Sequence, residues 1–395
     1  MEKTITDIPG VYAGGVRCGI KEYPGKSDLA FIFVPDAHSA AATFTRNIFK
    51  AAPIVYTGEC LAQGQLRAVV INSGNANAAT GPQGYRDAAR TSHLAAGYLS
   101  LKPHQVAVAS TGIIGVPLPM EKIESGLEEL LREPRLQNGF AAAEAIQTLD
   151  RRIKSVFYSA TVDGAEITVA GIAKGAGMIA PNMATMLAFL VTNVRVEQED
   201  LQQRLRHAVH DSFNMISVDT DTSTNDMVLM FATGEVELAE SPERTTAFSE
   251  LLRTASIDLA KQIARDGEGA EKLLEIKVEG AVTNSEARVI ALNVVNSPLL
   301  KAAVHGADPN WGRIIAAAGK NPLVTLIPER LDVYIGEEQI LHNGSLLQFN
   351  RPATVEHLRQ ATVSVRLHLN CGSETATAWG CDLTEDYVRI NTAYS

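Results

Sequence analysis

The stretch GAGMIAPNMATMLAFLVT, residues 175–192, contains no charged side chain. Its length of eighteen residues reaches the minimum for a transmembrane helix. Its first half carries two glycines, Pro181 and Asn182, which make it unsuited to a helix surrounded by lipid. Its second half, from Met186 onward, is a short apolar run typical of a buried strand. We therefore predict an irregular loop that leads into a buried strand, with Thr185 at the junction.

The composition is that of an ordinary globular protein. The chain has 395 residues, of which 46% are hydrophobic and 20% charged, enough for one large domain or two. Its formal net charge of −10 gives no overall attraction to nucleic acid or to an anionic membrane. The N-terminus lacks a basic segment followed by an apolar one, and the four cysteines form no C-x-x-C pair. We expect a cytoplasmic enzyme without nucleic-acid or membrane partners.

Segments with strand and helix patterns alternate along the chain. Residues 66–74 and 105–115 are typical of buried strands that end in polar loops. Asp163-Gly164 is a favoured two-residue hairpin turn between two β-branched runs. The predicted helices are 84–99, 120–134 with its end before Pro134, 140–150, 199–213 and 244–266. Residues 324–341 and 361–370 are predicted antiparallel strands. This order predicts a layered α/β or α+β fold with a mixed sheet.

Several short patterns resemble ligand sites but lack a necessary part. DTDTSTND (219–226) begins like a calcium loop, yet it has Thr224 in place of the glycine and Met230 in place of the final glutamate. GEGAEK (267–272) is glycine-rich, but no strand leads into it as a dinucleotide loop requires. His207 and His210 fit a solvated helix face better than a metal pair. We therefore expect no metal site.

A nucleophile must be sought outside the familiar triads. The sequence has no G-x-S-x-G elbow and no plausible Ser-His-Asp grouping. A threonine at a chain N-terminus can act without histidine, because its own α-amine, with a pKa near 8, serves as the base. Thr185 follows the small Ala184, and the nearby glycines and proline permit the backbone that self-cleavage needs. The residues alone equally fit a buried threonine that hydrogen-bonds to the backbone.

KGAGMIAPNMATMLAFLVTN (174–193) closely resembles the self-cleavage motif of the ornithine acetyltransferase family of arginine biosynthesis. The resemblance spans nearly the whole chain. Its further motifs are INSGNANAATG (71–81), STGIIG (110–115), DTDTSTND (219–226), DGEGAEK (266–272), ADPNWGRI (307–314) and YVRINTAYS (387–395).

The resemblance implies a layered α/β fold of the N-terminal-nucleophile-like type and a precursor that cuts itself between Ala184 and Thr185. The resulting α chain, 1–184, and β chain, 185–395, would share one core and form an α2β2 heterotetramer. Thr185 would take acetyl from N-acetylornithine and pass it to glutamate. Acetyl-CoA is a possible second donor, and no metal or bound cofactor is implied.

The family's functional positions carry over residue by residue. Thr111 and Gly112 stand where the family has its oxyanion donors, at the end of a predicted strand. The substrate-binding positions correspond to Thr148, Lys174, Thr185, Glu268, Asn391 and Ser395. The carboxylate of Glu268 would suit the side-chain amine of ornithine. Three asparagines, at positions 72, 75 and 77, fit either a substrate role or the satisfaction of backbone groups in a tight loop.

Three other interpretations stay open at this point. A hydrolase on the same scaffold would pass the acyl group to water. An assembly subunit without catalytic activity would never mature. A membrane protein would use the uncharged stretch as a span.

Overall fold

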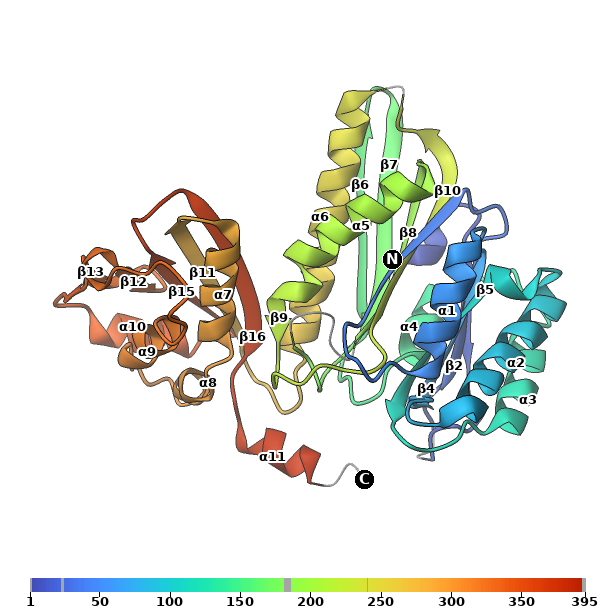
Figure 1. Ribbon diagram of the computed structural model, residues 1–395, viewed down its shortest axis with the longest axis horizontal. Coiled ribbons are helices and arrows are strands. Elements are labelled where there is room, and N and C mark those ends of the chain that lie inside the picture. The colour runs from blue at the N-terminus through green and yellow to red at the C-terminus, as the bar shows by residue number, and fades with distance from the viewer. Residues whose placement is uncertain (1, 23–24, 181–185, 240, 393–395) are drawn as a thin grey trace. The chain divides into compact units, whose positions relative to one another are not determined.

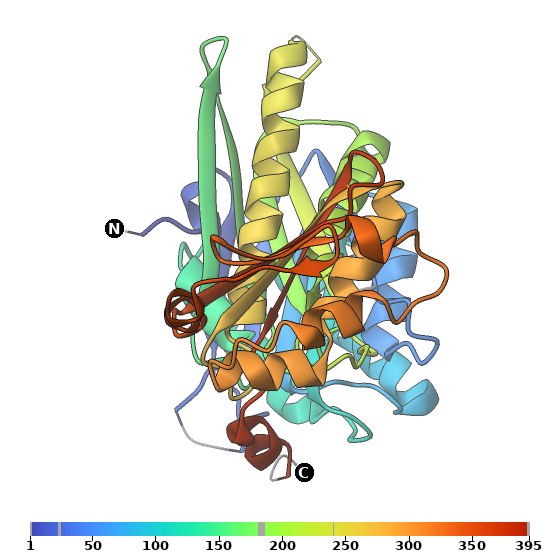
Figure 2. The ribbon, with the colours of Figure 1, turned by 90° about the vertical axis from the view of Figure 1, so that its left-hand side faces the viewer.

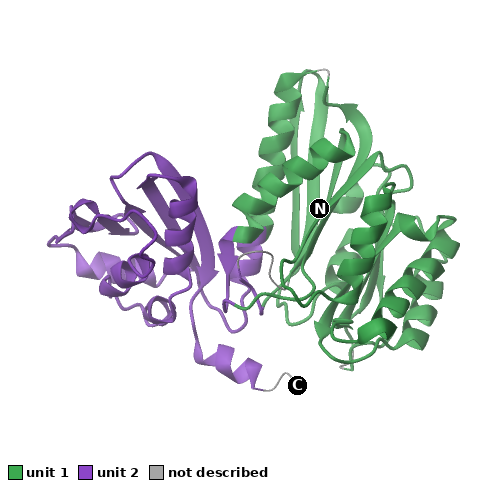
Figure 3. Cartoon of the chain, viewed as in Figure 1, with its two compact units in different colours: residues 1–176, 182–214, 221–259 green, residues 177–181, 215–220, 260–395 purple. Residues whose placement is uncertain are grey.

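The computed structural model describes residues 2–22, 25–180, 186–239 and 241–392 (Figure 1). Two compact units are coloured in Figure 3. The first comprises residues 1–176, 182–214 and 221–259, and the second comprises 177–181, 215–220 and 260–395. Each of the three sheets in the described residues mixes parallel and antiparallel pairs. The predicted layered fold with mixed sheets is therefore confirmed.

A four-stranded sheet forms one layer of the first unit. Its spatial order is β1 (Tyr12–Val16), β2 (Leu29–Phe33), β4 (Ala68–Asn75) and β5 (Val106–Ile113). Alternate residues face opposite sides, so Phe31 and Val70 belong to one core and Ile32 and Ile71 to another. The first core lies beneath α2 (Gly81–Leu99) and α3 (Met120–Leu130). The second includes residues of α1 (Ala52–Gln63) and α4 (Gly139–Ala145).

A five-stranded sheet shares that second core. Its spatial order is β3 (Ser39–Phe44), β10 (Met227–Glu237), β8 (Leu187–Arg195), β7 (Ala165–Lys174) and β6 (Lys154–Val162). Its edge strand β3 packs against α5 (Gln198–Asp211). The β6–β7 hairpin runs beside α6 (Pro242–Arg265) (Figure 2). The Tyr158 hydroxyl of β6 donates to Asp258 Oδ2 of α6 at 3.0 Å. Asp163 and Gly164 both have positive φ, as the predicted hairpin turn requires.

The second half of the uncharged stretch forms β8. This strand lies between β7 and β10, and every residue from Leu187 to Val194 is buried. Because both of its faces are covered, the strand shows no alternation of apolar and polar residues. The predicted buried strand is confirmed, and residues 175–180 before it are irregular. Among the described residues no single helix is long and apolar enough to cross a membrane, although a bent pair of later helices, 284–295 and 298–305, passes by length and composition together.

The second unit is built on a seven-stranded sheet. Its spatial order is β14 (Ser345–Leu346), β13 (Glu338–His342), β12 (Asp332–Ile335), β15 (Thr362–His368), β11 (Leu273–Ala281), β16 (Glu374–Cys381) and β9 (Ile216–Ser217). Helix α7 (Asn284–Val295) packs on β11 and β16. The remaining helices are α8 (Pro298–His305), α9 (Gly312–Ala318), α10 (Arg351–Leu358) and α11 (Glu385–Asn391). Short 3-10 helices span Ile5–Asp7, Pro103–Gln105, Phe213–Met215 and Pro328–Arg330.

Three predicted elements are shorter than the sequence pattern suggested. Helix α3 ends at Leu130, before Pro134 restricts the backbone. Helix α4 ends at Ala145 rather than at residue 150, because the Asp150 carboxylate binds a nearby amide and competes with helical hydrogen bonds. The strand predicted from residue 324 begins only at Asp332, after a 3-10 turn that starts at Pro328.

Candidate functional site

Thr111 and Gly112 lie at the end of β5, where this strand pairs with β4. Gly112 has φ +137°, and a Cβ there would lie 2.2 Å from the carbonyl carbon of Gly74. A side chain at this position would therefore push the two strands apart. Glycine at position 112 is explained by this close approach alone, so its substitution would not isolate a catalytic role.

Lys174 ends β7 and brings its ammonium to the end of β5. Its Nζ donates to Thr111 Oγ1 at 3.2 Å, and both side chains are almost fully buried. Because the threonine oxygen accepts this hydrogen bond, its own O–H remains the donor toward a third group. A cationic donor polarises the hydroxyl and strengthens the bond that it gives. The pair is suited to stabilising negative charge that develops on an oxygen nearby.

The carboxylate of Asp150 ties three chain segments to this pair. Its Oδ1 accepts from Lys154 Nζ at 2.6 Å and from the Gly175 amide at 2.7 Å. Its Oδ2 accepts from the Thr148 amide at 3.0 Å. Asp150 therefore binds the backbone of Thr148 directly and fixes Lys174 through the next residue, Gly175. Both Thr148 and Lys174 are predicted substrate-binding residues.

The Asp150 carboxylate is buried away from water. Its burial opposes ionisation, but the nearby ammonium groups of Lys154 and Lys174 outweigh the burial and hold the pKa of the carboxyl below its usual range. The ion pair with Lys154 is almost completely shielded from water, with exposed side-chain fractions of 0% and 1%. Loss of Asp150 would leave buried ammonium charge without this carboxylate, and loss of Lys154 would leave the carboxylate with Lys174 as its remaining compensating charge among these groups.

The polar motif 219–226 holds the chain before and after residues 181–185. In the second unit, Asp219 accepts hydrogen bonds from the amides of Met178, at 2.6 Å, and Ile179, at 2.9 Å. In the first unit, Asp226 Oδ1 accepts from the Met186 amide at 3.0 Å. The predicted cleavage site, Ala184 and Thr185, lies outside the described residues. Both carboxylates therefore fix the backbone close in sequence to the predicted nucleophile.

The pKa of Asp226 is shifted in the opposite direction from that of Asp150. Burial raises the pKa of Asp226 well above its usual range, and the hydrogen bond from the Met186 amide only partly offsets this rise. The carboxyl is fully buried, and this burial favours its neutral form. An uncharged side chain that still accepts the Met186 amide should therefore be tolerated at position 226.

Glu268 and Asn391 meet within the second unit. Asn391, on α11, donates from Nδ2 to Glu268 Oε2 at 2.8 Å. The glutamate carboxylate also packs against Gly177, where an added Cβ would lie 2.1 Å from Oε1. The structure therefore brings these two predicted substrate-binding residues together, next to the segment that leads to residue 185. Ser395 lies outside the described residues.

The asparagines of residues 71–81 bind protein groups. Asn72 Oδ1 accepts from the Ser110 hydroxyl at 2.6 Å, and Asn77 Nδ2 donates to the Gly84 carbonyl at 2.9 Å. Asn75 Nδ2 donates to the carbonyl of Val116 at 3.1 Å. These contacts favour the structural interpretation of the asparagines over the substrate role.

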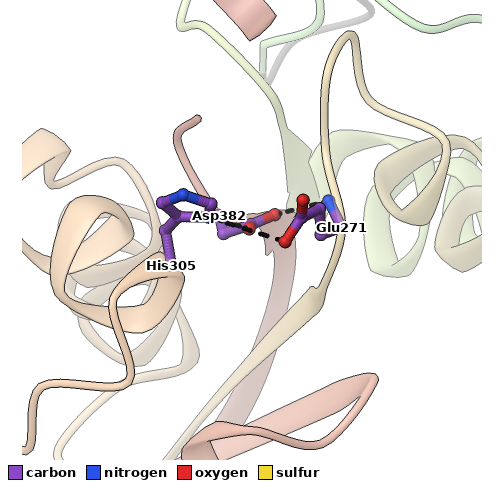
Figure 4. Close-up of side chains that lie close together, drawn as sticks. All are labelled: Glu271, His305 and Asp382. Atoms are coloured by element: carbon purple, nitrogen blue, oxygen red, sulfur yellow. Dashed lines mark hydrogen bonds and ion pairs between the residues drawn. The ribbon is translucent and has the colours of Figure 1, made fainter. Parts of the chain in front are cut away.

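Three side chains of types that bind metals also gather in the second unit. Atoms of Glu271, His305 and Asp382 lie within 4.8 Å of one another (Figure 4). Asp382 Oδ2 lies 3.2 Å from His305 Nδ1, and its Oδ1 accepts the amides of Glu271, at 2.9 Å, and Lys272, at 3.0 Å. These hydrogen bonds fix the backbone of the loop that follows Glu268.

The sequence model of the ArgJ family matches residues 12–395. The chain belongs to the ArgJ family. Two relatives are named arginine biosynthesis bifunctional protein ArgJ. The one from Oceanobacillus iheyensis is 45% identical over 99% of this chain and 96% of its own length, and the one from Symbiobacterium thermophilum is 46% identical over 99% and 98%. A solved structure of the ArgJ protein from Bacillus halodurans has a TM-score of 0.50 and 42% identity, covering 52% of this chain and 98% of that chain.

Family membership confirms the resemblance inferred from the motifs, but two residues of the site had no signal in the sequence pattern. The sequence pattern places Asp150 at the end of a predicted helix and Lys154 a few residues after it, and it assigns neither a functional role. Their spacing of four residues was the available clue, since opposite charges at that distance often pair. Only the fold shows that both are buried beside Lys174.

The two buried aspartates should respond in opposite ways to asparagine. Asp150→Asn leaves Lys154 without its counter-ion and should lower the free energy of unfolding by about 3 kcal/mol. Asp226→Asn keeps an oxygen that accepts from Met186 and cannot ionise in the unfolded chain, so at pH 7 it should leave this free energy unchanged or raise it. Urea unfolding of both variants at pH 7 measures the difference.

The pH dependence provides a second readout of the same pair. Because the folded pKa of Asp226 is raised, the wild-type contribution of this group to stability falls as pH rises above about 4, where the unfolded carboxyl ionises. Asp226→Asn should remove that fall. Equal losses of stability for the two variants at pH 7 would contradict the opposite pKa shifts of the two carboxyls.

Proposed function

We propose that this protein transfers acetyl from N-acetyl-L-ornithine to L-glutamate through an acetyl-Thr185 intermediate, in arginine biosynthesis. The observation that carries this proposal is the 45–46% identity to arginine biosynthesis bifunctional proteins over 99% of the chain. The Lys174–Thr111 pair supports it, because an acyl transfer needs a donor for the developing oxyanion.

Maturation is proposed to precede transfer. The Thr185 hydroxyl attacks the Ala184 carbonyl, and the resulting ester is hydrolysed to leave residues 1–184 and residues 185–395 as separate chains. The amides of Met178 and Met186, bound by Asp219 and Asp226, keep the backbone fixed on both sides of the bond to be cut. Strand β7, before the bond, pairs with β8, after it, so backbone hydrogen bonds would keep the two products together.

Transfer then proceeds in two acyl exchanges. The free α-amine of Thr185 accepts the hydroxyl proton as the oxygen attacks the acetyl carbonyl. The amide bond breaks, ornithine leaves with that proton, and an acetyl ester remains on Thr185. The amine of glutamate attacks this ester and regenerates the threonine hydroxyl. In both steps Thr111, polarised by Lys174, and Gly112 are proposed to stabilise the oxyanion.

Substrate contacts are proposed for the remaining positions of the family pattern. Lys174 and Thr148 would hold the α-carboxylate that both amino acids share. Glu268 would meet the cationic side-chain amine of ornithine, with its carboxylate oriented by Asn391. Ser395 would complete this set.

The proposed assembly is an α2β2 heterotetramer in the cytoplasm, and acetyl-CoA is proposed as a second donor. No metal or bound cofactor is required, because the α-amine, the hydroxyl and the oxyanion donors supply every proton and charge of the two exchanges. Acetylglutamate formation should therefore be unchanged after dialysis against EDTA. A loss restored by a divalent metal would contradict this part of the proposal.

Substitution of the nucleophile should block both maturation and transfer. Thr185→Ala removes the hydroxyl, so the purified protein should remain a single chain of 42.3 kDa without transferase activity. Thr185→Ser keeps a hydroxyl and should retain measurable cleavage. Intact mass under denaturing conditions gives the first readout, and acetylglutamate formation gives the second. Full activity of the alanine variant would refute the mechanism.

The same assay separates a transferase from a hydrolase. A transferase should convert acetylornithine and glutamate into equal amounts of ornithine and acetylglutamate. Release of free acetate as the main product, at saturating glutamate, would instead favour the hydrolase.

Thr111 provides the test of the oxyanion role. Thr111→Ala removes the polarised hydroxyl and should lower kcat by about 10²–10³ with little change in KM. Thr111→Ser keeps the oxygen that accepts from Lys174 and should lose much less. A rise in KM at constant kcat for the alanine variant would indicate a binding role.

A further inference from the structure

A hollow of about 740 Å³ in the first unit is lined by basic side chains. One wall is the chain after β3, with Arg46 and Lys50, and the other is the last turns of α5, with Arg206, His207 and His210. His210 is four residues from Arg206 and three from His207, so each of these two lies beside His210 on the helix surface. All three side chains line the hollow. The volume is within the range usual for small-molecule sites.

The positive charge of this hollow is not neutralised by the protein. The side chains of Arg46, Lys50 and Arg206 form no ion pair or hydrogen bond with any residue in the described part of the chain. No described carboxylate lines the hollow, and the adjacent Asp211 is engaged by His210, at 3.0 Å, and by Arg253, at 3.5 Å. Three permanent cations without partners are notable in a protein whose net charge is −10.

The backbone that carries these cations is fixed. Gln202 of α5 donates to the Ala42 carbonyl of the edge strand β3, at 3.0 Å, and accepts from the amide of the same residue, at 3.2 Å. Asn47 donates to the Thr222 carbonyl at 2.8 Å, and the Thr45 hydroxyl donates to the Ser223 carbonyl at 2.7 Å. The two walls of the hollow are therefore held in place before any ligand arrives.

The hollow also lies near the start of β8. Phe44, which lines it, pairs with Met227 of β10, and Met227 pairs with Leu187 of β8. The backbone of Leu187 is therefore two strand spacings, about 10 Å, from the backbone of Phe44. An acyl group carried at the far end of a phosphate-bearing molecule could reach this part of the sheet while its phosphates stayed among the cations.

We propose that this hollow binds an anion that carries at least two phosphate groups. Arginine fits phosphate because its planar guanidinium donates two parallel hydrogen bonds, and three permanent charges exceed what a single carboxylate would use. Two kinds of ligand have this chemistry. One is a coenzyme A derivative, whose role as acyl donor rests on the proposed acetyl transfer. The other is free polyphosphate or pyrophosphate, whose binding does not depend on that proposal.

The test is calorimetric titration of the full-length protein with pyrophosphate, with coenzyme A and with glutamate, at fixed ionic strength. The wild-type protein should bind at least one of the two phosphate probes saturably and more tightly than glutamate. The double variant Arg46→Ala/Arg206→Ala should bind that probe at least tenfold more weakly, since each arginine contributes a charge-assisted contact. Arg132→Ala, at an exposed arginine outside the hollow, is the matched control and should bind as the wild type does.

The outcomes distinguish coenzyme A from free polyphosphate as the ligand. They also distinguish a failure of this anion site from a failure of the proposed acetyl transfer. Tighter binding of coenzyme A than of pyrophosphate assigns the hollow to a nucleotide-linked carrier, and equal binding assigns it to free polyphosphate. The double variant should keep the wild-type rate of acetyl transfer from acetylornithine to glutamate, so failure of this site is distinguishable from failure of the transferase. The absence of saturable binding, or equal affinity in the double variant and the wild type, would overturn the inference.

Discussion

The buried carboxylate of Asp150 is the interaction on which the predicted site of the first unit depends. It binds the Thr148 amide after α4, the Lys154 ammonium at the start of β6 and the Gly175 amide after β7. Because Lys174 immediately precedes Gly175, this carboxylate also fixes the end of the strand that presents an ammonium to Thr111. The charge is retained away from water because two lysines compensate it.

Two further aspartates bind backbone amides on either side of the predicted cleavage site. Asp219 and Asp226 mark the two ends of a polar motif that began like a calcium loop, and both accept amide hydrogen bonds. Asn225 of the same motif donates to the Ser110 carbonyl, one residue before Thr111. Burial dominates at Asp226 and raises the pKa of its carboxyl, whereas at Asp150 the nearby ammonium groups outweigh burial and lower the pKa.

Local patterns predicted the strands and the hairpin well, because burial and turn chemistry leave a direct trace in the sequence. The apolar runs that became β4, β5 and β8 and the Asp163-Gly164 turn are examples. Family motifs supplied the site residues, and the fold brings Thr111 to Lys174 and Glu268 to Asn391. The contacts that could not be predicted are those between residues far apart in the sequence. The burial of Asp150 depends on how distant segments pack, and the close approach that requires Gly112 depends on the neighbouring strand.

The pairing of β7 with β8 has a consequence for how this protein can be made. A chain cut between Ala184 and Thr185 consists of two polypeptides that each contribute strands to one sheet and side chains to one core. Neither piece could bury its share of that sheet alone. Folding of the uncut chain is a unimolecular event, whereas reassembly of separated pieces would require two chains to meet. If the proposed cleavage occurs, the uncut chain would therefore be the form that folds, and denaturation of the cut protein would be difficult to reverse at low concentration.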